Sequence, residues 1–246
     1  MKKKNKNLNN KLGDAIIGYS GYIGSYLNSK KKVRNLYNSN NIEKIKNKKF
    51  KTVYLAAPDS IKYLANKYPE KDKKRIKKLL LKLKNLNCKR IIYFSTIDVL
   101  NISKRNYYGA NRLLLEKFIK KNFKTYLIIR LPSLFGWKLK KNYFFDIINF
   151  KSLKFYNSKT RLQWYFLENI LKDIRILKKK KIRIANLVSP PITCMQLVKY
   201  LKHNIYDFEN SIHKYSYDEK FQKRKYFSSK REILNKMKNI YKTTLK

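Results

Sequence analysis

Three glycines spaced three residues apart, Gly18, Gly21 and Gly24, form the pattern in this sequence most suited to holding a phosphate group. The chain has only six glycines in 246 residues, and half of them stand in the stretch IIGYSGYIGSYL. Glycine tolerates positive φ, lets a ligand approach the backbone closely, and lets a helix pack tightly on a strand. A turn that holds a pyrophosphate at a helix N-terminus needs all three properties, so the stretch predicts a dinucleotide-binding loop. A tight strand–helix turn without a ligand is the alternative interpretation.

A second group of residues further along the chain has the side chains for proton transfer. Ser95 and Thr96 end the β-rich run KRIIYFST, and Tyr108 precedes Arg112 by four residues at the start of a predicted helix. One helical turn places Tyr108 and Arg112 on the same face. Because a nearby cation favours the phenolate, we expect Arg112 to lower the pKa of Tyr108 toward neutrality. Asp98 either caps the turn after the strand or donates a proton.

These residues must be positioned by an alternation of strands and helices. Short β-rich runs predict strands within 14–20, 32–39, 51–58, 89–99 and 124–132, and helical periodicity predicts helices from near Tyr22, over 69–87 and over 107–122. This alternation predicts an α/β fold, a Rossmann-type doubly wound parallel sheet with helices on both faces. Ligands of such sheets bind outside the carboxyl ends of the strands, so the glycines and the hydroxyl groups are expected at one edge.

The motifs resemble those of the extended short-chain dehydrogenase/reductase family, which includes nucleotide-sugar epimerases, dehydratases and reductases. GYSGYIGSYL, TVYLAAP, FSTIDV, YGANRLLLE and IIRLPSLFG are each similar to a family motif, over a span from Ala15 to about Val198. The resemblance implies catalysis by Thr96, Tyr108 and Arg112. It also implies that NADP or NAD is bound by Gly18, Gly21, Tyr22, Ile23, Gly24, Asn38, Ala56, Ala57, Ser95, Tyr108 and Arg112.

Two departures from the family pattern concern the catalytic residues. Arg112 stands where the family has Lys, which keeps the charge but replaces a compact ammonium by a planar fork, so the usual bond to the nicotinamide ribose is put in doubt. Ile97 and Asp98 stand where a dehydratase has Asp and Glu. With one of the two acidic groups missing, dehydration is the less favoured chemistry.

Another departure concerns the choice of dinucleotide. The second predicted strand ends in LYNSNN, without the acidic residue that would bind a ribose 2′-hydroxyl. Arg34, Asn38 and Ser39 could face a 2′-phosphate instead, which favours NADP slightly over NAD. The short interval before TVYLAAP also indicates that a strand–helix pair common in the family is missing.

The composition is extremely basic, with 61 Lys and Arg residues against 15 Asp and Glu and a formal net charge of +46. The Lys residues are spread along the whole chain, so we interpret them as a compositional bias and expect nonspecific polyanion binding. The two cysteines and two histidines argue against a metal cluster. No apolar run approaches the roughly 18 residues of a membrane span, so we expect a cytoplasmic protein.

The length and the 43% hydrophobic content support one sizeable core. We predict a basic N-terminal extension at 1–13, an NAD(P)-binding Rossmann domain at 14–136, and a reduced substrate lobe with a basic tail at 137–246. The predicted function is that of an NAD(P)-dependent epimerase/dehydratase-like oxidoreductase acting on a nucleotide-linked sugar in surface polysaccharide synthesis, with a homodimer left open. The alternatives are a catalytically inactive dinucleotide-binding sensor or scaffold and a nonspecific nucleic-acid-binding protein on a Rossmann scaffold.

Overall fold

A parallel sheet forms the centre of the molecule. The computed structural model describes residues 12–101, 106–153, 156–202 and 226–244, so most of the predicted N-terminal extension lies outside the described residues. Within them, the main sheet has the strand order β2-β1-β3-β4-β5-β9, and all its strand pairs are parallel. Its strands are β1 (Ala15–Ile17), β2 (Asn35–Tyr37), β3 (Lys49–Leu55), β4 (Asn87–Thr96), β5 (Tyr126–Leu131) and β9 (Ile184–Asn186).

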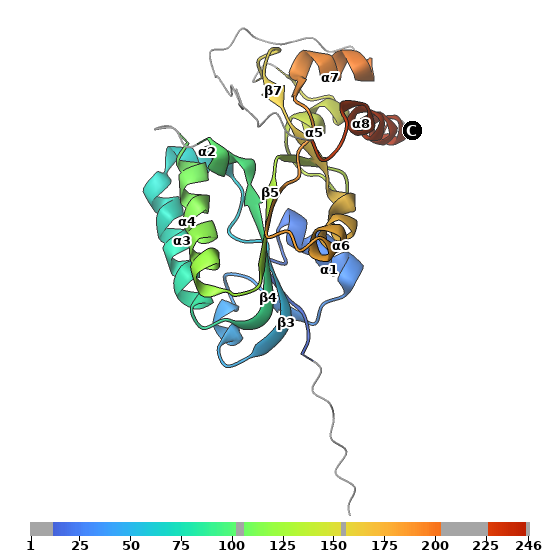
Figure 1. The fold of residues 1–246 in the computed structure, drawn as a ribbon. Coiled ribbons are helices and arrows are strands. Elements are labelled where there is room, and N and C mark those ends of the chain that lie inside the picture. The colour runs from blue at the N-terminus through green and yellow to red at the C-terminus, as the bar shows by residue number, and fades with distance from the viewer. Residues whose placement is uncertain (1–11, 102–105, 154–155, 203–225, 245–246) are drawn as a thin grey trace, which may run out of the picture.

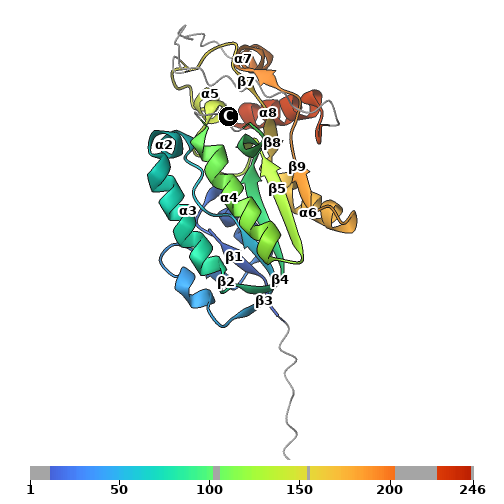
Figure 2. The same ribbon diagram turned by 60° about the vertical axis from the view of Figure 1, so that its left-hand side comes forward.

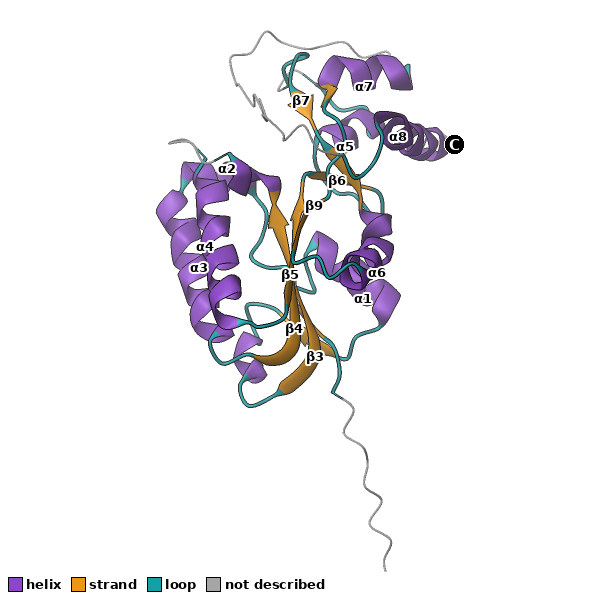
Figure 3. Cartoon of the chain, viewed as in Figure 1, coloured by secondary structure: helices purple, strands orange, loops and turns teal. Residues whose placement is uncertain are grey.

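Helices cover both faces of this sheet (Figure 1). One face carries α2 (Lys62–Lys67), α3 (Pro69–Leu83) and α4 (Tyr107–Asn122), and the other carries α1 (Tyr22–Lys31) and α6 (Ile170–Lys179). Figure 3 shows the resulting order of layers, helices then strands then helices. The predicted Rossmann-type doubly wound fold is therefore confirmed.

The strands are buried on both sides because each contributes alternate side chains to two cores. In β4, Ile91 and Tyr93 pack with the α3 and α4 residues of one core, whereas Ile92 and Phe94 pack with α1 and α6 in the other. Such two-sided burial explains why β4 is a nearly continuous apolar run in the sequence. It also fixes the register, since a shift by one residue would exchange the two cores.

The chain beyond the carboxyl edge builds a smaller lobe, which Figure 2 shows above the sheet. Two small sheets pair β6 (Ser133–Phe135) with β8 (Trp164–Phe166) and β7 (Arg161–Leu162) with β10 (Ile192–Thr193). The remaining elements are α5 (Tyr143–Ile148), α7 (Cys194–Leu201), α8 (Lys230–Thr244) and the 3-10 helices η1 (Ile42–Ile45), η2 (Ile97–Leu100) and η3 (Leu167–Asn169). Two elements after residue 136 belong with the main sheet, because β9 is one of its strands and α6 packs on its face. The division into domains at residue 136 stays a prediction.

The connection from β2 to β3 is short. Residues 38–48 are all described, and their regular structure is η1 alone. The strand β2 consequently forms one edge of the sheet, and the further strand–helix pair that the sequence predicts to be missing is absent from the described residues between β2 and β3. Of the described helices, none is both long enough and apolar enough to cross a membrane.

Candidate functional site

The glycine loop joins β1 to α1 at the carboxyl edge of the sheet, and the packing of the chain itself requires two of its glycines. Gly18 has φ +88°, and a Cβ there would lie 2.4 Å from the carbonyl oxygen of Ala56. A Cβ at Gly24 would lie 2.1 Å from the carbonyl oxygen of Gly18. These contacts hold the strand, the turn and the helix together, as expected for a strand–helix turn with or without a ligand.

Gly21 is different, because nothing in the described structure requires a glycine there. It precedes α1 with φ −77° and ψ 171°, a conformation open to any residue. The nearest atom to a Cβ at this position would be the Gly18 carbonyl oxygen at 3.4 Å, an ordinary contact. The exposed side of Gly21 adjoins the first turn of α1, whose N–H groups favour an anion. Because Gly21 is exposed, the backbone beside these N–H groups is open to an approaching anion such as a pyrophosphate.

Tyr22 and Ile23 start α1 and pack their side chains against the core between α1, α6 and the sheet. They can therefore contact a phosphate only through their backbone N–H groups. The Tyr22 hydroxyl is buried without a hydrogen-bond partner among the described residues. Burial, and then the nearby charge of Glu168, raises its pKa.

The ends of the neighbouring strands complete this part of the edge. The N–H group of Ala56, directly after β3, donates to the Ile17 carbonyl oxygen at 2.8 Å, and Ala57 packs partly buried against the core on the α3 side. Asn38 follows β2, but its Oδ1 accepts from the Asn40 N–H at 2.9 Å and is used within the turn. These positions lie at the carboxyl edge of the sheet, and their contacts with a cofactor stay predictions.

The predicted role of Arg34 at a 2′-phosphate is wrong. Arg34 directly precedes β2 and is exposed at the amino end of that strand. Asn38 lies at the opposite end, separated by the length of a three-residue strand, about 10 Å. The argument for NADP loses its only cation for this reason.

Thr96 and Asp98 form a buried hydrogen-bonded turn at the carboxyl end of β4. The Thr96 hydroxyl donates to Asp98 Oδ2 at 2.7 Å and accepts from the Asp98 N–H at 3.2 Å. Thr96 is therefore the residue that caps η2, and Asp98 is its partner. The other carboxylate oxygen of Asp98 accepts a hydrogen bond from the Lys62 ammonium of α2.

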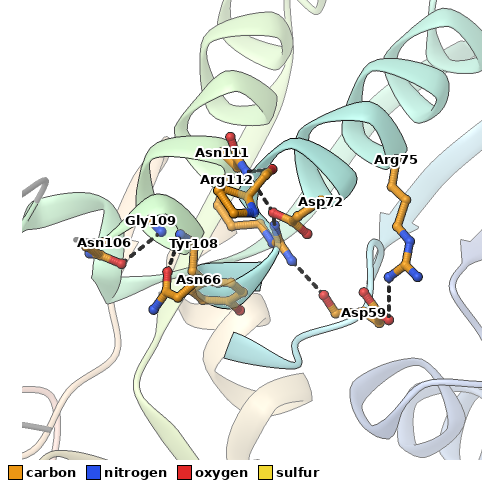
Figure 4. Close-up of polar contacts among 10 residues, drawn as sticks. Asp59, Asn66, Asp72, Arg75, Asn106, Tyr108, Gly109, Asn111 and Arg112 are labelled. Carbon is orange, nitrogen blue, oxygen red and sulfur yellow. Dashed lines mark hydrogen bonds and ion pairs between the residues drawn. The ribbon is translucent and has the colours of Figure 1, made fainter. Parts of the chain in front are cut away.

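Tyr108 is held beside this turn by the first turn of α4. A Cβ at Gly109 would lie 2.2 Å from the Asp98 carbonyl oxygen, so only glycine allows α4 to start this close to η2. The Asn106 side chain caps the helix by accepting from the Gly109 N–H at 3.1 Å, and the Tyr108 N–H donates to Asn66 Oδ1 at 2.8 Å (Figure 4). The structure thus brings Thr96, Asp98 and Tyr108 together.

The expected lowering of the Tyr108 pKa is wrong. Burial raises the pKa of Tyr108 to about 12; the Arg112 charge lowers it, and the charges of Asp98 and Asp72 raise it. The Arg112 guanidinium carbon lies 4.3 Å from the centre of the Tyr108 ring, so the two residues do share a face as predicted. Desolvation nevertheless outweighs the cation, and the phenol stays protonated at neutral pH.

Arg112 is engaged with the protein itself. Its Nη1 donates to Asp72 Oδ2 at 2.6 Å, and its Nη2 donates to the Asp59 carbonyl oxygen at 2.7 Å (Figure 4). Asp72 also accepts from Asn111 Nδ2 at 2.9 Å, and both partners of the ion pair are buried. The guanidinium therefore ties α4 to α3 and to the loop after β3, and these contacts compete with the predicted contact to a cofactor ribose.

Ser95 is likewise part of an internal network. Its hydroxyl donates to Glu116 Oε1 at 2.7 Å, and Arg130 holds the same carboxylate through two hydrogen bonds of 2.9 and 2.6 Å. Glu116 is fully buried. Ser95 thus links β4 to α4 and β5, and its predicted contact with the cofactor remains a prediction.

The sequence reasoning missed Lys62, Asp72 and Arg130, which all reach this region. Lys62 carries no recognisable signal in a chain with 61 basic residues, whereas Arg130 lies within the stretch IIRLPSLFG and was not singled out there. Asp72 does carry one, since it is one of only 15 acidic residues and stands within a strongly basic helix. Glu70 stands in the same helix and is exposed, so scarcity marks Asp72 as a candidate and does not by itself show that it is buried.

Comparisons with known proteins reveal the fold through structure and not through sequence. No family profile and no curated sequence matches the chain. Among solved structures, a UDP-glucose 4-epimerase from Thermotoga maritima with UDP-glucose matches 95% of this chain and 99% of its own, with a TM-score of 0.67 and 14% identity. The chain has the fold of nucleotide-sugar epimerases.

Two further structures show the range of proteins with this fold. A variant UDP-glucuronic acid 4-epimerase from Bacillus cereus, in complex with UDP-4-deoxy-4-fluoro-glucuronic acid and NAD, has 14% identity and a TM-score of 0.59, and the match covers 80% of this chain and 85% of the epimerase. A monomeric L-threonine 3-dehydrogenase from a metagenome has 19% identity and a TM-score of 0.59, and the match covers 80% of this chain and 83% of the dehydrogenase. At such identities the likeness establishes the fold, and the substrate must be argued from the site.

Proposed function

We propose that the chain is a nicotinamide-dinucleotide-dependent oxidoreductase of the epimerase/dehydratase type that acts on a nucleotide-linked sugar. The observation that carries the proposal is Gly21, a glycine that neither the backbone conformation nor the packing requires. A ligand that approaches the backbone at the start of α1 accounts for it. The names of the epimerase neighbours support a nucleotide sugar as the substrate.

NAD is the dinucleotide that we propose. A bound nicotinamide ring supplies the acceptor and donor of hydride. Gly18, Gly21 and Gly24 would shape the loop around the pyrophosphate, with the N–H groups of Tyr22 and Ile23 facing it. Arg34 lies at the amino end of β2, away from Asn38, so the reason to favour NADP is gone. The Bacillus cereus neighbour holds NAD.

We propose that Tyr108 transfers the proton to the substrate oxygen and that Thr96 contacts the substrate beside it. Tyr108 is protonated at neutral pH, so it is in the form that can donate a proton to a substrate oxygen during reduction of a keto sugar. Thr96 lies on the same edge, with its oxygen fixed by the turn that it forms with Asp98. Asp98 alone occupies the place of the two acidic residues of dehydratases, which favours epimerisation or reduction over loss of water.

A spectrophotometric assay tests this function. Wild type, Tyr108→Phe and Tyr107→Phe are each mixed with NAD or NADH and a panel of UDP-linked sugars and 4-keto sugars. Nicotinamide absorbance reports a net oxidation or reduction of the sugar. Chromatography of the sugar products reports epimerisation, which returns the hydride and leaves no net change in absorbance. We expect turnover in wild type, a loss of about a hundredfold in Tyr108→Phe as for a general acid, and no loss in Tyr107→Phe, whose side chain is exposed. Equal rates in both variants would exclude the role of Tyr108.

A catalytically inactive dinucleotide-binding protein is the second candidate. The observation in its favour is Arg112, whose guanidinium is bound to Asp72 and to the Asp59 carbonyl group. The same assay separates the candidates when calorimetry accompanies it. Binding of NAD by calorimetry without turnover of any sugar supports the inactive protein, and turnover excludes it.

A further inference from the structure

The region around Thr96, Asp98 and Tyr108 is called the Thr96 corner here. The helix α2 contacts it through two side chains. Lys62 and Asn66 are one helical turn apart and lie on the same face. The Lys62 ammonium donates to Asp98 Oδ1, and Asn66 Oδ1 accepts from the Tyr108 N–H at 2.8 Å. Asp98, which follows β4, and Tyr108, at the start of α4, are therefore both held by α2. This helix lies outside the sequence motifs.

The Asp98 carboxylate connects Lys62 to Thr96 by hydrogen bonds. Asp98 Oδ1 accepts from Lys62 and Oδ2 accepts from the Thr96 hydroxyl at 2.7 Å. Thr96 and Asp98 are 7% and 8% exposed, so the chain of contacts is largely shielded from water. A hydroxyl group has a single proton, and here Asp98 accepts it. Thr96 therefore offers an acceptor lone pair, not a donor, to any other group that approaches it.

A carboxylate as buried as that of Asp98 is costly without a cation. The Arg112 charge is already compensated, because Asp72 binds it in a pair whose side chains are 4% and 6% exposed. The Lys62 side chain is more open, at 23%, and its ammonium is the cation that contacts Asp98. The positive charge at the Thr96 corner thus comes from α2, and not from α4, where the sequence predicts it.

We propose that Lys62, in place of Arg112, is the positioning residue of this site, and that it sets the charge near the nicotinamide end of the dinucleotide through Asp98 and Thr96. The inference rests on the proposed function. The strand order β1-β3-β4 puts the Thr96 end of β4 two strands from the glycine loop, or about 10 Å. A dinucleotide whose pyrophosphate lies at the loop reaches this far with one of its two nucleosides.

The proposal makes a prediction about charge that needs no catalysis. The oxidised nicotinamide ring carries a positive charge and the reduced ring does not. The pair of Lys62 and Asp98 is neutral in wild type, so it discriminates little between the two redox forms. Removal of the Lys62 charge leaves Asp98 to attract the oxidised ring, and removal of the Asp98 charge leaves Lys62 to repel it.

The experiment measures Kd for NAD and for NADH by calorimetry in wild type, Lys62→Met, Asp98→Asn and the double variant. We expect the ratio of Kd(NAD) to Kd(NADH) to fall about fivefold in Lys62→Met and to rise about fivefold in Asp98→Asn, as for a unit charge near the ring in a partly solvated site. The double variant is expected to return to the wild-type ratio. Opposite shifts that cancel are a signature that a merely structural role cannot produce.

Three further variants complete the test. Lys62→Arg keeps the charge and should keep the ratio, and Lys62→Gln replaces the Met variant as the neutral form if the Met replacement unfolds the protein. Lys67→Met removes an exposed charge from the same helix, where Lys67 stacks on Tyr68, and should leave the ratio unchanged. Arg75→Met removes an exposed charge from α3, where Arg75 pairs with Asp59, and should also leave the ratio unchanged.

The outcomes separate this inference from the function on which it rests. If wild type binds neither NAD nor NADH, the proposed function fails and the inference fails with it. If wild type binds both and the ratio stays constant in Lys62→Met and Asp98→Asn, the inference alone is overturned. A shift in Lys62→Arg as large as that in Lys62→Met would also overturn it, because the effect would then not follow the charge.

Discussion

Arg112 donates a 2.6 Å hydrogen bond to the Asp72 carboxylate, and the pair joins α4 to α3 where both side chains are buried. The Arg in place of the Lys expected from the family thus has a partner that explains it. A guanidinium has several donors in one plane, so it can bind Asp72 and the Asp59 carbonyl oxygen together while its face stacks on Tyr108. An ammonium could not make this set of contacts.

The first prediction concerns the stability that this pair provides. Arg112→Met leaves Asp72 buried without its cation, so the free energy of unfolding should fall by about 3 kcal/mol. Arg75→Met is the matched control, because Arg75 and Asp59 form an exposed pair at 3.5 Å and its loss should cost under about 1 kcal/mol. Urea denaturation measures both values. Equal small losses would show that the buried pair does not stabilise the fold.

A second prediction follows from the raised pKa of Tyr108, about 12 against the ordinary 10.0. Between these values the unfolded chain releases the phenol proton while the folded chain keeps it, so the free energy of unfolding falls as pH rises. The contribution is about 1.4 kcal/mol per pH unit for this group. Tyr108→Phe should therefore lose less stability than wild type between pH 10 and 11 in urea denaturation.

Tyr107→Phe is the control for the alkaline measurement. Tyr107 is 46% exposed, so its replacement removes a phenol from the same helix without removing a buried one. The variant should follow the wild-type dependence on pH. A wild-type slope in Tyr108→Phe would contradict the assignment of the alkaline effect to Tyr108.

The sequence predicted the sheet and its helices well where patterns extend over many residues. The predicted helix 107–122 coincides with α4, because its apolar positions recur with helical spacing over sixteen residues. The strands β7 and β10 have two residues each, too short for any alternation to be recognised. In the lobe, contacts between distant segments decide the structure, so local patterns gave no boundaries there.

The site was predictable in its backbone and less so in its charges. The glycines, Thr96 and Tyr108 lie at the carboxyl edge as expected, because motif spacing encodes the turn and the helix start. The partners of Tyr108 and Arg112 come from α2 and α3, which share no motif with them. The described residues include four buried acidic ones, and each has a hydrogen-bond partner, namely Asp72, Asp98, Glu116 and Asp173. The sequence does not separate these four from the acidic residues that are exposed, such as Glu70.

A third prediction tests whether the net charge of +46 serves nucleic-acid binding. A basic surface that reflects composition should bind RNA and DNA of any sequence, and the affinity should fall steeply with salt because counterion release drives it. Fluorescence anisotropy with several unrelated oligonucleotides, from about 50 to 200 mM salt, measures this. A preference for one sequence that persists at the higher salt would favour the nucleic-acid-binding alternative.

The last prediction separates the two roles of glycine in the loop. Gly18→Ala should destabilise the protein, because its Cβ would meet the Ala56 carbonyl oxygen at 2.4 Å and its φ of +88° is strained for alanine. Gly21→Ala should keep the wild-type melting temperature, since its φ of −77° is ordinary and its Cβ contacts nothing closer than 3.4 Å. NAD binding by Gly21→Ala should nevertheless fall at least tenfold in calorimetry, because the methyl group occupies the space assigned to the pyrophosphate. Undiminished binding in this stable variant would exclude a dinucleotide at the start of α1 and leave the glycine loop a purely structural turn.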